Sequence, residues 1–386
     1  MSFFMRFFSI ILVLITVLTI FVIPIQAKEQ TQTPNMKFDC TSTILMEAST
    51  GTVLYEYNAD APLPPASVTK IMTLLLVMEA IDSGTLKYTD TITTSSYAAS
   101  MGGSQVFLKE GEQLSAEDMI KSVVIASAND AAVALAEHLC GSETAFVERM
   151  NSKAKELGMK NTNFENTNGL DDTATNHYVS ARDIAIMSQE LLKHPDILKY
   201  TTIWMDTIRN GSFGLTNTNR LVRFYPGATG LKTGSTFKAK FCVSATAKRD
   251  NMHLICVIMG APRSDVRNSI ATQLLNWGFA NFELYEDLSN EMSPIKINAG
   301  KENTCQIKSN DFRIVVKKGT KDKIEKTYVI PTNIKAPINK GDEVGYIEYR
   351  YNRQIIGKSP IISSMNVDKI DFATLFVRIL SKFCIK

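Results

Sequence analysis

Three short motifs, far apart in the chain, constrain its fold more than any other feature, because a shared reaction would require them to meet in space. They read SVTK at 67–70, SAN at 127–129 and KTG at 232–234. In the first motif a hydroxyl and an amine stand three residues apart, which on a helix places both side chains on one face. A serine hydroxyl becomes a good nucleophile when a neighbouring base removes its proton. The three motifs, in this order, predict an enzyme of acyl transfer.

Ser67 and Lys70 are the predicted nucleophile and base. Ser67 follows two prolines and an alanine at the predicted start of a helix, where unpaired N–H groups and the helix dipole favour negative charge. A serine at this position is, by itself, more typical of a helix N-cap. Lys70 favours catalysis instead, because it lies one turn inside a helix rich in Leu, Ile and Met. Desolvation there would lower its pKa, and a second cation, for which Lys232 is the candidate, would lower it further.

The second motif lies in a small polar break between two predicted helices. Alone, the segment 125–130 would be interpreted as a turn with capping residues. As part of an active site, Ser127 would relay a proton to the leaving amine, and the amide of Asn129 would hold a substrate carbonyl group. We therefore predict that Ser127 is catalytic and that Asn129 binds substrate.

The third motif opens a predicted strand. Lys232 and Thr233 provide a cation and a hydroxyl suited to a substrate carboxylate, although a basic strand end facing solvent is the alternative interpretation of Lys232. Gly234 would let a substrate backbone approach and pair with the strand edge. The backbone N–H groups of Ser67 and Ser235 would form the oxyanion hole.

The N-terminal 27 residues have the composition of a secretory signal peptide. Arg6 is followed by an apolar run to Ile25, and Ala27 is a small residue suited to the position before a cleavage site. An uncleaved membrane anchor is the alternative, because the apolar run is long enough to span a bilayer. Either interpretation places the rest of the chain, beginning with a linker at 28–37, outside the cytoplasm.

Composition argues against several classes of function. The net charge is only +3 and no long basic block occurs, so we expect no nucleic-acid partner. The six cysteines are scattered without metal-type spacing, and we predict no metal site and no cofactor. Cys242 and Cys256 would project from opposite faces of a predicted hairpin, so we expect mostly free, mostly buried thiols.

The pattern of apolar residues predicts an α+β catalytic domain over 38–285, built from an antiparallel sheet with helices on it. Past Tyr285 short β-type runs predict a small all-β domain over 286–364, in which we expect no chemistry. In the catalytic domain, the expected strands are 43–46, 53–57, 240–248 and 252–259, and the expected helices begin at Ser67, Ser115, Asp130, Glu143 and Ile184, with a closing helix at 274–282.

Residues 365–386 are predicted to form an amphipathic helix that is too short and too charged to span a bilayer. It would pack on the β domain of its own chain or, as we predict, lie flat in the outer leaflet of the cytoplasmic membrane, with Arg378 and Lys382 near anionic headgroups. Its apolar face would consist of Phe372, Leu375, Phe376, Ile379, Leu380 and Phe383.

These motifs resemble those of the low-molecular-mass penicillin-binding proteins, the D-alanyl-D-alanine carboxypeptidases of bacterial cell walls. The resemblance extends to Gly169-Leu170 with His177, to 229–234, to Trp277-Gly278-Phe279, to the β-rich C-terminal part and to the terminal helix. It implies a β-lactamase/transpeptidase-like domain that removes the terminal D-alanine from peptidoglycan stem pentapeptides through a Ser67 acyl-enzyme and is inhibited by β-lactams such as penicillin. It also implies attachment to the outer face of the bacterial cytoplasmic membrane, and it assigns Arg267 to binding of the substrate's terminal carboxylate.

Two other functions remain open from the sequence. A serine β-lactamase of class A would need a glutamate and a water to clear the acyl group; Glu165 is the candidate, but the Leu-Asn that normally follows is missing. A non-catalytic wall-binding or β-lactam-sensing protein would use the same pocket, and the intact Ser67, Lys70 and Lys232 argue against it. His177 is predicted to pack or to cap rather than to catalyse.

Overall fold

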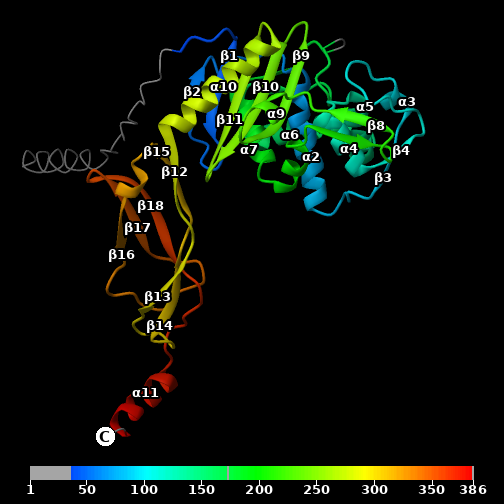
Figure 1. The fold of residues 1–386 in the computed structure, drawn as a ribbon. Helices are drawn as coiled ribbons and strands as arrows, with labels where there is room; N and C mark the ends of the chain where they lie inside the picture. The colour runs from blue at the N-terminus through cyan, green and yellow to red at the C-terminus, as the bar shows by residue number, and fades with distance from the viewer. Residues whose placement is uncertain (1–35, 172–173, 385–386) are drawn as a thin grey trace, which may run out of the picture. The chain divides into compact units, whose positions relative to one another are not determined.

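The computed structural model describes residues 36–171 and 174–384, so the predicted signal peptide and nearly all of the predicted linker lie outside the described residues. Its central element is a five-stranded antiparallel sheet in the order β2-β1-β11-β10-β9 (Figure 1). The strands from both ends of the predicted catalytic domain pair in this sheet, and the α+β class is confirmed. Their bounds are β1 Ser42–Glu47, β2 Val53–Tyr57, β9 Ala228–Thr236, β10 Lys240–Arg249 and β11 Met252–Ala261.

The predicted hairpin is formed by β10 and β11, which pair Arg249 with Met252 across the turn. Cys242 of β10 is paired with Gly234 of β9, whereas Cys256 of β11 is paired with Ala245. Both cysteines are buried and free. Burial raises the pKa of the Cys242 thiol to about 11, so it stays protonated at neutral pH.

Helices cover both faces of this sheet. On one face Ile44 and Val257 belong to the main core, together with residues of α2 (Lys70–Asp82) and α7 (Ala181–Leu191). Side chains alternate along a strand, so Leu45 and Leu254 point to the other face. There they lie against Gly278 of α10 (Ser264–Asn281), where an added Cβ would come within 2.7 Å of Leu254.

The first motif spans two kinds of helix. Ser67 lies in a 3₁₀ turn, η1 (Ala66–Thr69), which leads directly into α2. The helix α2 is apolar on nearly every side and almost entirely buried, as is typical of a helix at the centre of a domain. This position explains why Lys70, its first residue, is buried.

Serine side chains cap two of the helices, and α7 begins at Ala181, three residues before the expected start at Ile184. Ser115 and Ser180 accept hydrogen bonds from the N–H groups of Asp118 and Asp183, at the starts of α4 and α7. These caps satisfy N–H groups that the first helical turn leaves without partners. The other elements of this part are β3 Thr91–Thr93, α3 Ser96–Ala99, β4 Gln113–Ser115, α4 Ala116–Ile125, α5 Asn129–Cys140, α6 Glu143–Glu156, β5 Thr162–Asn163, β6 Tyr178–Val179, η2 Pro195–Ile197, α8 Leu198–Thr201, β7 Met205–Ile208, β8 Phe213–Thr216 and α9 Leu221–Phe224.

The closing helix corrects the sequence prediction, because α10 begins at Ser264 and not at Leu274. Its first ten residues are mostly polar, and Ile270 and Ala271 are the buried apolar residues among them. Such a segment lacks the clear apolar stripe by which a helix is recognised in a sequence. As a result Arg267 lies in the first turns of this helix rather than in a loop after the hairpin.

The β-rich part follows α10 without a break, since β12 begins at Phe282. It contains the pair β12-β15 and a five-stranded sheet in the order β13-β14-β18-β17-β16. In its core the ring of Tyr349 stacks on Phe312 with 3.8 Å between centroids, and its hydroxyl donates to Asp287. Strand β13 was not expected from the sequence. The bounds are β12 Phe282–Asp287, β13 Glu291–Lys296, β14 Thr304–Ser309, β15 Phe312–Lys317, η3 Lys321–Lys323, β16 Glu325–Val329, β17 Glu343–Tyr351 and β18 Gln354–Ser363.

The terminal helix α11 covers Phe372–Cys384 and leaves its apolar side chains exposed, Phe372 at 82% and Phe376 at 53%. One detail differs from the sequence prediction. Val367, within the predicted tail, is buried in the core of the β-rich part and its N–H donates to Ile338. Arg378 of α11 donates to the carbonyl oxygen of Gly300 and to Asn303 Oδ1, which connects the helix to this loop.

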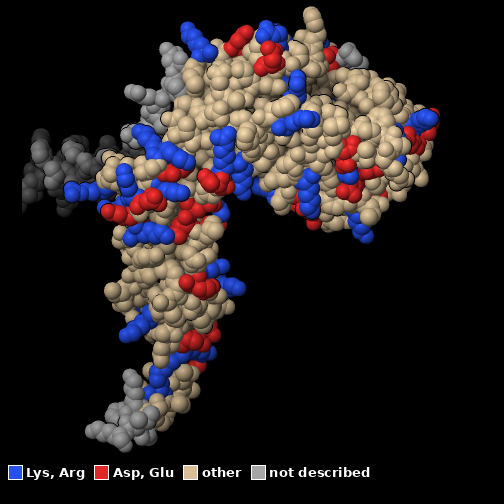
Figure 2. Space-filling model, viewed as in Figure 1, with Lys and Arg blue, Asp and Glu red and all other residues tan. Residues whose placement is uncertain are grey.

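None of the helices in the described ranges has both the length and the apolar character needed to cross a membrane. The face of the molecule in Figure 2 carries basic and acidic side chains intermixed, without a broad area of one sign.

Candidate active site

The amine of Lys70 is the centre of the site. Its Nζ lies 2.9 Å from Ser67 Oγ, 2.6 Å from Asn129 Oδ1 and 2.9 Å from the backbone oxygen of Asn168. The side chain is fully buried. The structure therefore brings the first two motifs into direct contact through one nitrogen atom.

Two of the three partners of this amine can only accept hydrogen bonds. The amide of Asn129 is oriented by its Nδ2, which donates to the carbonyl oxygen of Gly102, so that Oδ1 faces Lys70. A neutral amine has two hydrogens and one lone pair. With its hydrogens directed to Asn129 and Asn168, its lone pair faces the hydroxyl of Ser67. This is the arrangement that a base for Ser67 requires.

The electrostatic environment favours the neutral amine. Burial, and after it the charge of Lys232, lowers the pKa of Lys70 well below its usual value of 10.5, against a smaller opposing effect of Asp130. Lys232 is itself buried, and its Nζ donates to the backbone oxygen of Thr233. Burial and the nearby Arg267 lower the pKa of Lys232 to about 7.

Strand β9 lies directly against the Ser67 turn. A Cβ added to Gly234 would lie 2.8 Å from the backbone nitrogen of Ser67 and 2.9 Å from the carbonyl oxygen of Pro65. Only glycine leaves room for this approach. The third motif thus reaches the nucleophile through its backbone, with Ser235 exposed as the next residue of this edge strand.

Arg267 lies behind the third motif, with a side chain that is almost buried. Its Nη1 donates to the backbone oxygen of Cys242, and its Nε and Nη2 donate to Asn268 Oδ1. Among the described residues, two of its five N–H groups remain without an acceptor. Burial lowers the pKa of Arg267 only to about 10, so it is charged at neutral pH.

The second motif holds a loop in place as well as contacting Lys70. Ser127 has a φ of 62°, and its hydroxyl makes no hydrogen bond within the described part of the chain. The N–H of Asn129 donates to the carbonyl oxygen of Ser104, and the carboxylate of Asp130 accepts from Val106 and Leu108. The strained turn at Ser127 therefore lies between the end of α4 and two residues, Asn129 and Asp130, that are held by these hydrogen bonds.

Sequence reasoning missed Asn168 as a contact of Lys70, because a backbone carbonyl carries no residue signature. The loop that contains it packs on the Ser67 turn: an added Cβ on Gly169 would overlap the carbonyl oxygen of Ala66. Thr73 of α2 donates to the backbone oxygen of Thr167 at 2.6 Å. A conformation with positive φ, 82° at Gly169, is needed for this close approach.

His177 holds the same loop, in agreement with its predicted packing role. Its Nδ1 accepts from the N–H of Glu165 at 3.1 Å, so its proton lies on Nε2, which donates to Thr69 Oγ1 at 2.8 Å. Burial lowers the pKa of His177 to about 4, which keeps the ring neutral near pH 7. The histidine acts on the first motif through Thr69 alone.

Thr218 is a second residue that sequence reasoning missed. Its N–H donates to the carbonyl oxygen of Ile125, just before the second motif, and its hydroxyl accepts from Thr233 Oγ1 at 2.8 Å. It therefore connects the second and third motifs. No signal marks it in the sequence, since its position depends on how the loop before α9 folds back.

Glu165 does not occupy the position that a deacylating glutamate would need. Its carboxylate accepts from the N–H of Asn176, and no hydrogen bond joins it to Ser67 or Lys70 among the residues described. The turn that carries Ser67 borders a small pocket of about 70 Å³, lined in part by Pro65, Leu170, Thr236 and Lys238.

Comparison with protein families gives two matches. The family described as D-alanyl-D-alanine carboxypeptidase matches residues 27–263, and the one described as penicillin-binding protein 5, C-terminal domain, matches residues 279–369. Among curated proteins, the D-alanyl-D-alanine carboxypeptidase DacF of Bacillus subtilis is 41% identical over 381 residues, covering 97% of each chain. The carboxypeptidase DacC of Escherichia coli is 33% identical, covering 90% of this chain and 88% of its own.

Solved structures give the same result. Penicillin-binding protein 5 from Haemophilus influenzae superposes with a TM-score of 0.76 at 32% identity, covering 86% of this chain and 99% of its own. Penicillin-binding protein D2 from Listeria monocytogenes, in its ampicillin-bound form, superposes with a TM-score of 0.59 at 30% identity, covering 64% and 100%.

Proposed function

This chain belongs to the D-alanyl-D-alanine carboxypeptidase family of serine peptidases, within the low-molecular-mass penicillin-binding proteins, and we propose that it removes the terminal D-alanine from peptidoglycan stem pentapeptides through an acyl-enzyme on Ser67. The observation that carries this proposal is the set of contacts around Lys70, which leaves its lone pair directed at the Ser67 hydroxyl. A site without a base in this position would support binding but not acyl transfer.

Acylation follows from these contacts. Ser67 Oγ bonds to the carbonyl carbon of the penultimate D-alanine while its proton passes to Lys70 Nζ. The resulting oxyanion accepts hydrogen bonds from the N–H groups of Ser67 and Ser235. The C–N bond then breaks, and the proton held on Lys70 passes through the Ser127 hydroxyl to the amine of the departing D-alanine, which leaves Lys70 neutral and Ser127 unchanged. Water hydrolyses the ester and restores Ser67.

The terminal carboxylate of the substrate selects the scissile bond. Lys232 and Thr233 supply a cation and a hydroxyl beside the nucleophile, and Arg267 adds a charge and two N–H groups behind them. The amide of Asn129 accepts from Lys70 and donates one N–H to Gly102, so its second N–H is the group that would bind a substrate carbonyl. A β-lactam carries a carboxylate and a reactive carbonyl in a similar arrangement, so it acylates Ser67 and blocks the site.

The proposed site of action is the outer face of the cytoplasmic membrane, with α11 as the attachment. Its exposed Phe372, Leu375, Phe376, Ile379 and Leu380 form an apolar surface suited to the interfacial region of a bilayer. Hydrogen bonds from Arg378 to Gly300 and Asn303 connect the helix to the β-rich part.

Labelling with fluorescent penicillin tests the nucleophile. Ser67→Ala should abolish covalent labelling and lower the release of D-alanine from a pentapeptide by roughly 10⁴-fold or more, as for other serine nucleophiles. Ser212→Ala, at an exposed turn, is the matched control and should label normally. Labelling that persists in Ser67→Ala would falsify the assignment. Rapid penicillin hydrolysis without release of D-alanine would instead support a β-lactamase.

A further inference from the structure

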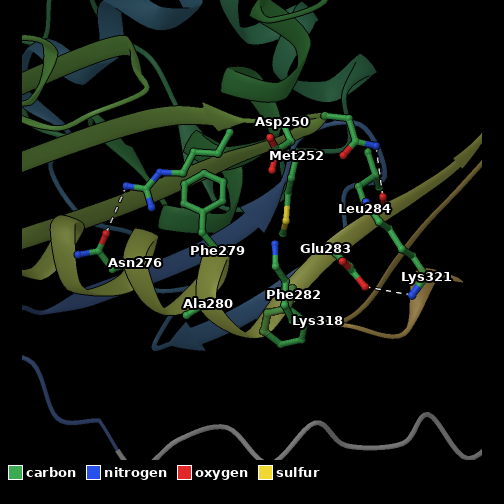
Figure 3. Close-up of a pocket in the computed structure, with 12 residues that line it drawn as sticks. Asp250, Met252, Asn276, Phe279, Ala280, Phe282, Glu283, Leu284, Lys318 and Lys321 are labelled. Atoms are coloured by element: carbon green, nitrogen blue, oxygen red, sulfur yellow. Dashed lines mark hydrogen bonds between the residues drawn. The ribbon is translucent and has the colours of Figure 1, made fainter.

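A pocket of about 490 Å³, distinct from the active site, lies where the turn between β10 and β11 meets the end of α10 and the loop after β15 (Figure 3). None of the motif residues lines it. Arg249, at its edge, is five residues along β10 from Ser244, the partner of Lys232, a separation of about 17 Å. Any ligand of this pocket is therefore independent of the acyl-transfer chemistry.

The guanidinium group of Arg249 is held by aromatic rings. It lies 5.0 Å from the ring centroid of Tyr225 and 4.7 Å from that of Phe279. Its Nη2 makes only long hydrogen bonds, of 3.5 Å each, to the backbone oxygen of Pro226 and to Asn276 Oδ1. Stacking fixes the plane of a guanidinium while leaving its N–H edge available, which suits it to bind an oxyanion.

Two further cations, Lys318 and Lys321, line the same pocket. None of the three cations forms an ion pair with a described residue. Two carboxylates are also present, but Glu283 already accepts the backbone N–H groups of Thr320 and Lys321, as Figure 3 shows for Lys321. Glu283 stays negatively charged, because these backbone hydrogen bonds outweigh burial and lower its pKa. The three cations and the two carboxylates, Glu283 and Asp250, together leave the pocket lining with a net charge of +1.

Part of the pocket wall is apolar. Phe279 and Phe282 are buried, and with Met252 and Leu284 they give the wall an apolar surface. A ligand that fits both features has an anionic head with several oxygen acceptors and a short carbon chain. A phosphodiester carries one negative charge and offers two free oxygens, which suits the guanidinium of Arg249 with its parallel N–H groups.

We propose that this pocket binds an organic phosphate, with Arg249 as the principal contact and Lys318 and Lys321 as supporting charges. The phosphate belongs either to a soluble polymer of phosphodiesters or to a lipid headgroup, since both present the same chemistry. Binding would link the turn at 249–252 directly to the loop at 318–321, two segments that each contact β12 and α10.

Calorimetric titration of the full chain in detergent, with sn-glycerol 3-phosphate as the probe, tests the site. The proposal expects saturable binding with a Kd of about 1 mM or tighter, no binding of glycerol, and weakening of roughly 10-fold or more in Arg249→Gln. Arg223→Gln is the matched control, because Arg223 also stacks on aromatic rings, those of Trp204 and Phe224, and lines none of the described pockets. It should bind like the wild type.

Two further arms complete the test. Lys321→Gln, at an exposed position, should weaken binding without affecting folding, and penicillin labelling of Ser67 should be unchanged in every variant. The source of the phosphate is tested with poly(glycerol phosphate) in solution and with vesicles of phosphatidylglycerol. If Arg249→Gln weakens binding to the polymer, the ligand is the soluble polymer; if it weakens binding to the vesicles, the ligand is the lipid headgroup. Absence of saturable binding, or equal affinity in Arg249→Gln and Arg223→Gln, would overturn the proposal, whatever the result at Ser67.

Discussion

At the residue scale, the chemistry depends on the number of protons on two buried lysines. Lys70 must be neutral to accept a proton from Ser67, whereas Lys232 must be charged to hold a carboxylate. The same physical effects, burial and a neighbouring cation, lower the pKa of both. Lys232 has a pKa of about 7, so its charge is present on the acidic side of that value.

Replacing Lys70 by arginine tests the need for a neutral base. An arginine retains the positive charge and the capacity to donate hydrogen bonds, but it stays protonated at every accessible pH. We expect Lys70→Arg to acylate with penicillin about 10²–10⁴-fold more slowly, the usual contribution of a general base. Stopped-flow labelling measures this rate, and circular dichroism checks the fold. Acylation at the wild-type rate would exclude Lys70 as the base.

The pH dependence of kcat/KM tests Lys232. Its pKa is lowered to about 7, so its charge is present below pH 7 and lost as the pH rises through that value. We expect kcat/KM for a D-alanyl peptide to fall on the alkaline side, by about tenfold for each further pH unit. Lys232→Arg should remove this alkaline limb, because the guanidinium remains charged. An identical alkaline limb in the variant would show that another group is responsible.

At the scale of elements, the site depends on two segments pressed against the Ser67 turn: strand β9 from one side and the loop at 164–170 from the other. Each approaches at a glycine, Gly234 or Gly169, where a side chain would collide with the backbone of the turn. Backbone contact of this kind fixes the turn more rigidly than flexible side chains would.

Gly234→Ala tests the contact of β9. The added methyl group would lie 2.8 Å from Ser67 N, so strand and turn must separate. A displacement of about 1 Å in such a site costs roughly 10²-fold in rate, and we expect penicillin acylation to slow by at least that factor. Gly214→Ala in β8 is the control, because a methyl group added there would meet no atom within 4 Å and the variant should label normally. Normal acylation by Gly234→Ala would contradict the proposed packing.

His177 makes the stability of the loop depend on pH. Its pKa is about 4 in the folded protein and 6.5 when exposed, so the unfolded chain binds the proton first as the pH falls. Its contribution is therefore present above pH 6.5 and lost toward pH 4, amounting to about 3 kcal/mol. We expect the free energy of unfolding, measured with urea at these two pH values, to fall less in His177→Gln than in the wild type, by about this amount. An equal loss in both proteins would refute it.

At the scale of the whole molecule, α11 exposes a row of large apolar side chains that nothing in the described chain covers. The structure also indicates where this helix can be removed. Val367 belongs to the core of the β-rich part, so a deletion should begin at Phe372 and leave Val367 in place.

Removal of residues 372–386 should transfer the enzyme from membranes to the soluble fraction, with penicillin labelling intact. Phe376→Asp in the full chain should weaken vesicle binding, because it places a charge on the apolar face. Val377→Asp, on the flank of the same helix, should have a smaller effect. Sedimentation with vesicles measures both. If the shortened chain remains with membranes, α11 is not the attachment.

The sequence by itself determined the α+β class, the family resemblance, the separate β-rich part and the motif residues that are candidates for one site. These follow from local features, since motif chemistry and apolar periodicity can be recognised within a few residues. The start of α10 differs from its prediction, because the first ten residues of this helix have no clear apolar stripe.

Only the tertiary structure decided which atoms surround the Lys70 amine. The carbonyl oxygen of Asn168 beside Lys70 and the position of Arg378 depend on contacts between residues 75 or more positions apart. The bridge through Thr218 combines a backbone contact with Ile125 and a side-chain contact with Thr233. The same holds for the pocket beside Arg249, whose three cations come from two distant segments. Local sequence specifies which groups are available, whereas the packing of the chain decides which of them share a desolvated space, and that space sets their protonation and their chemistry.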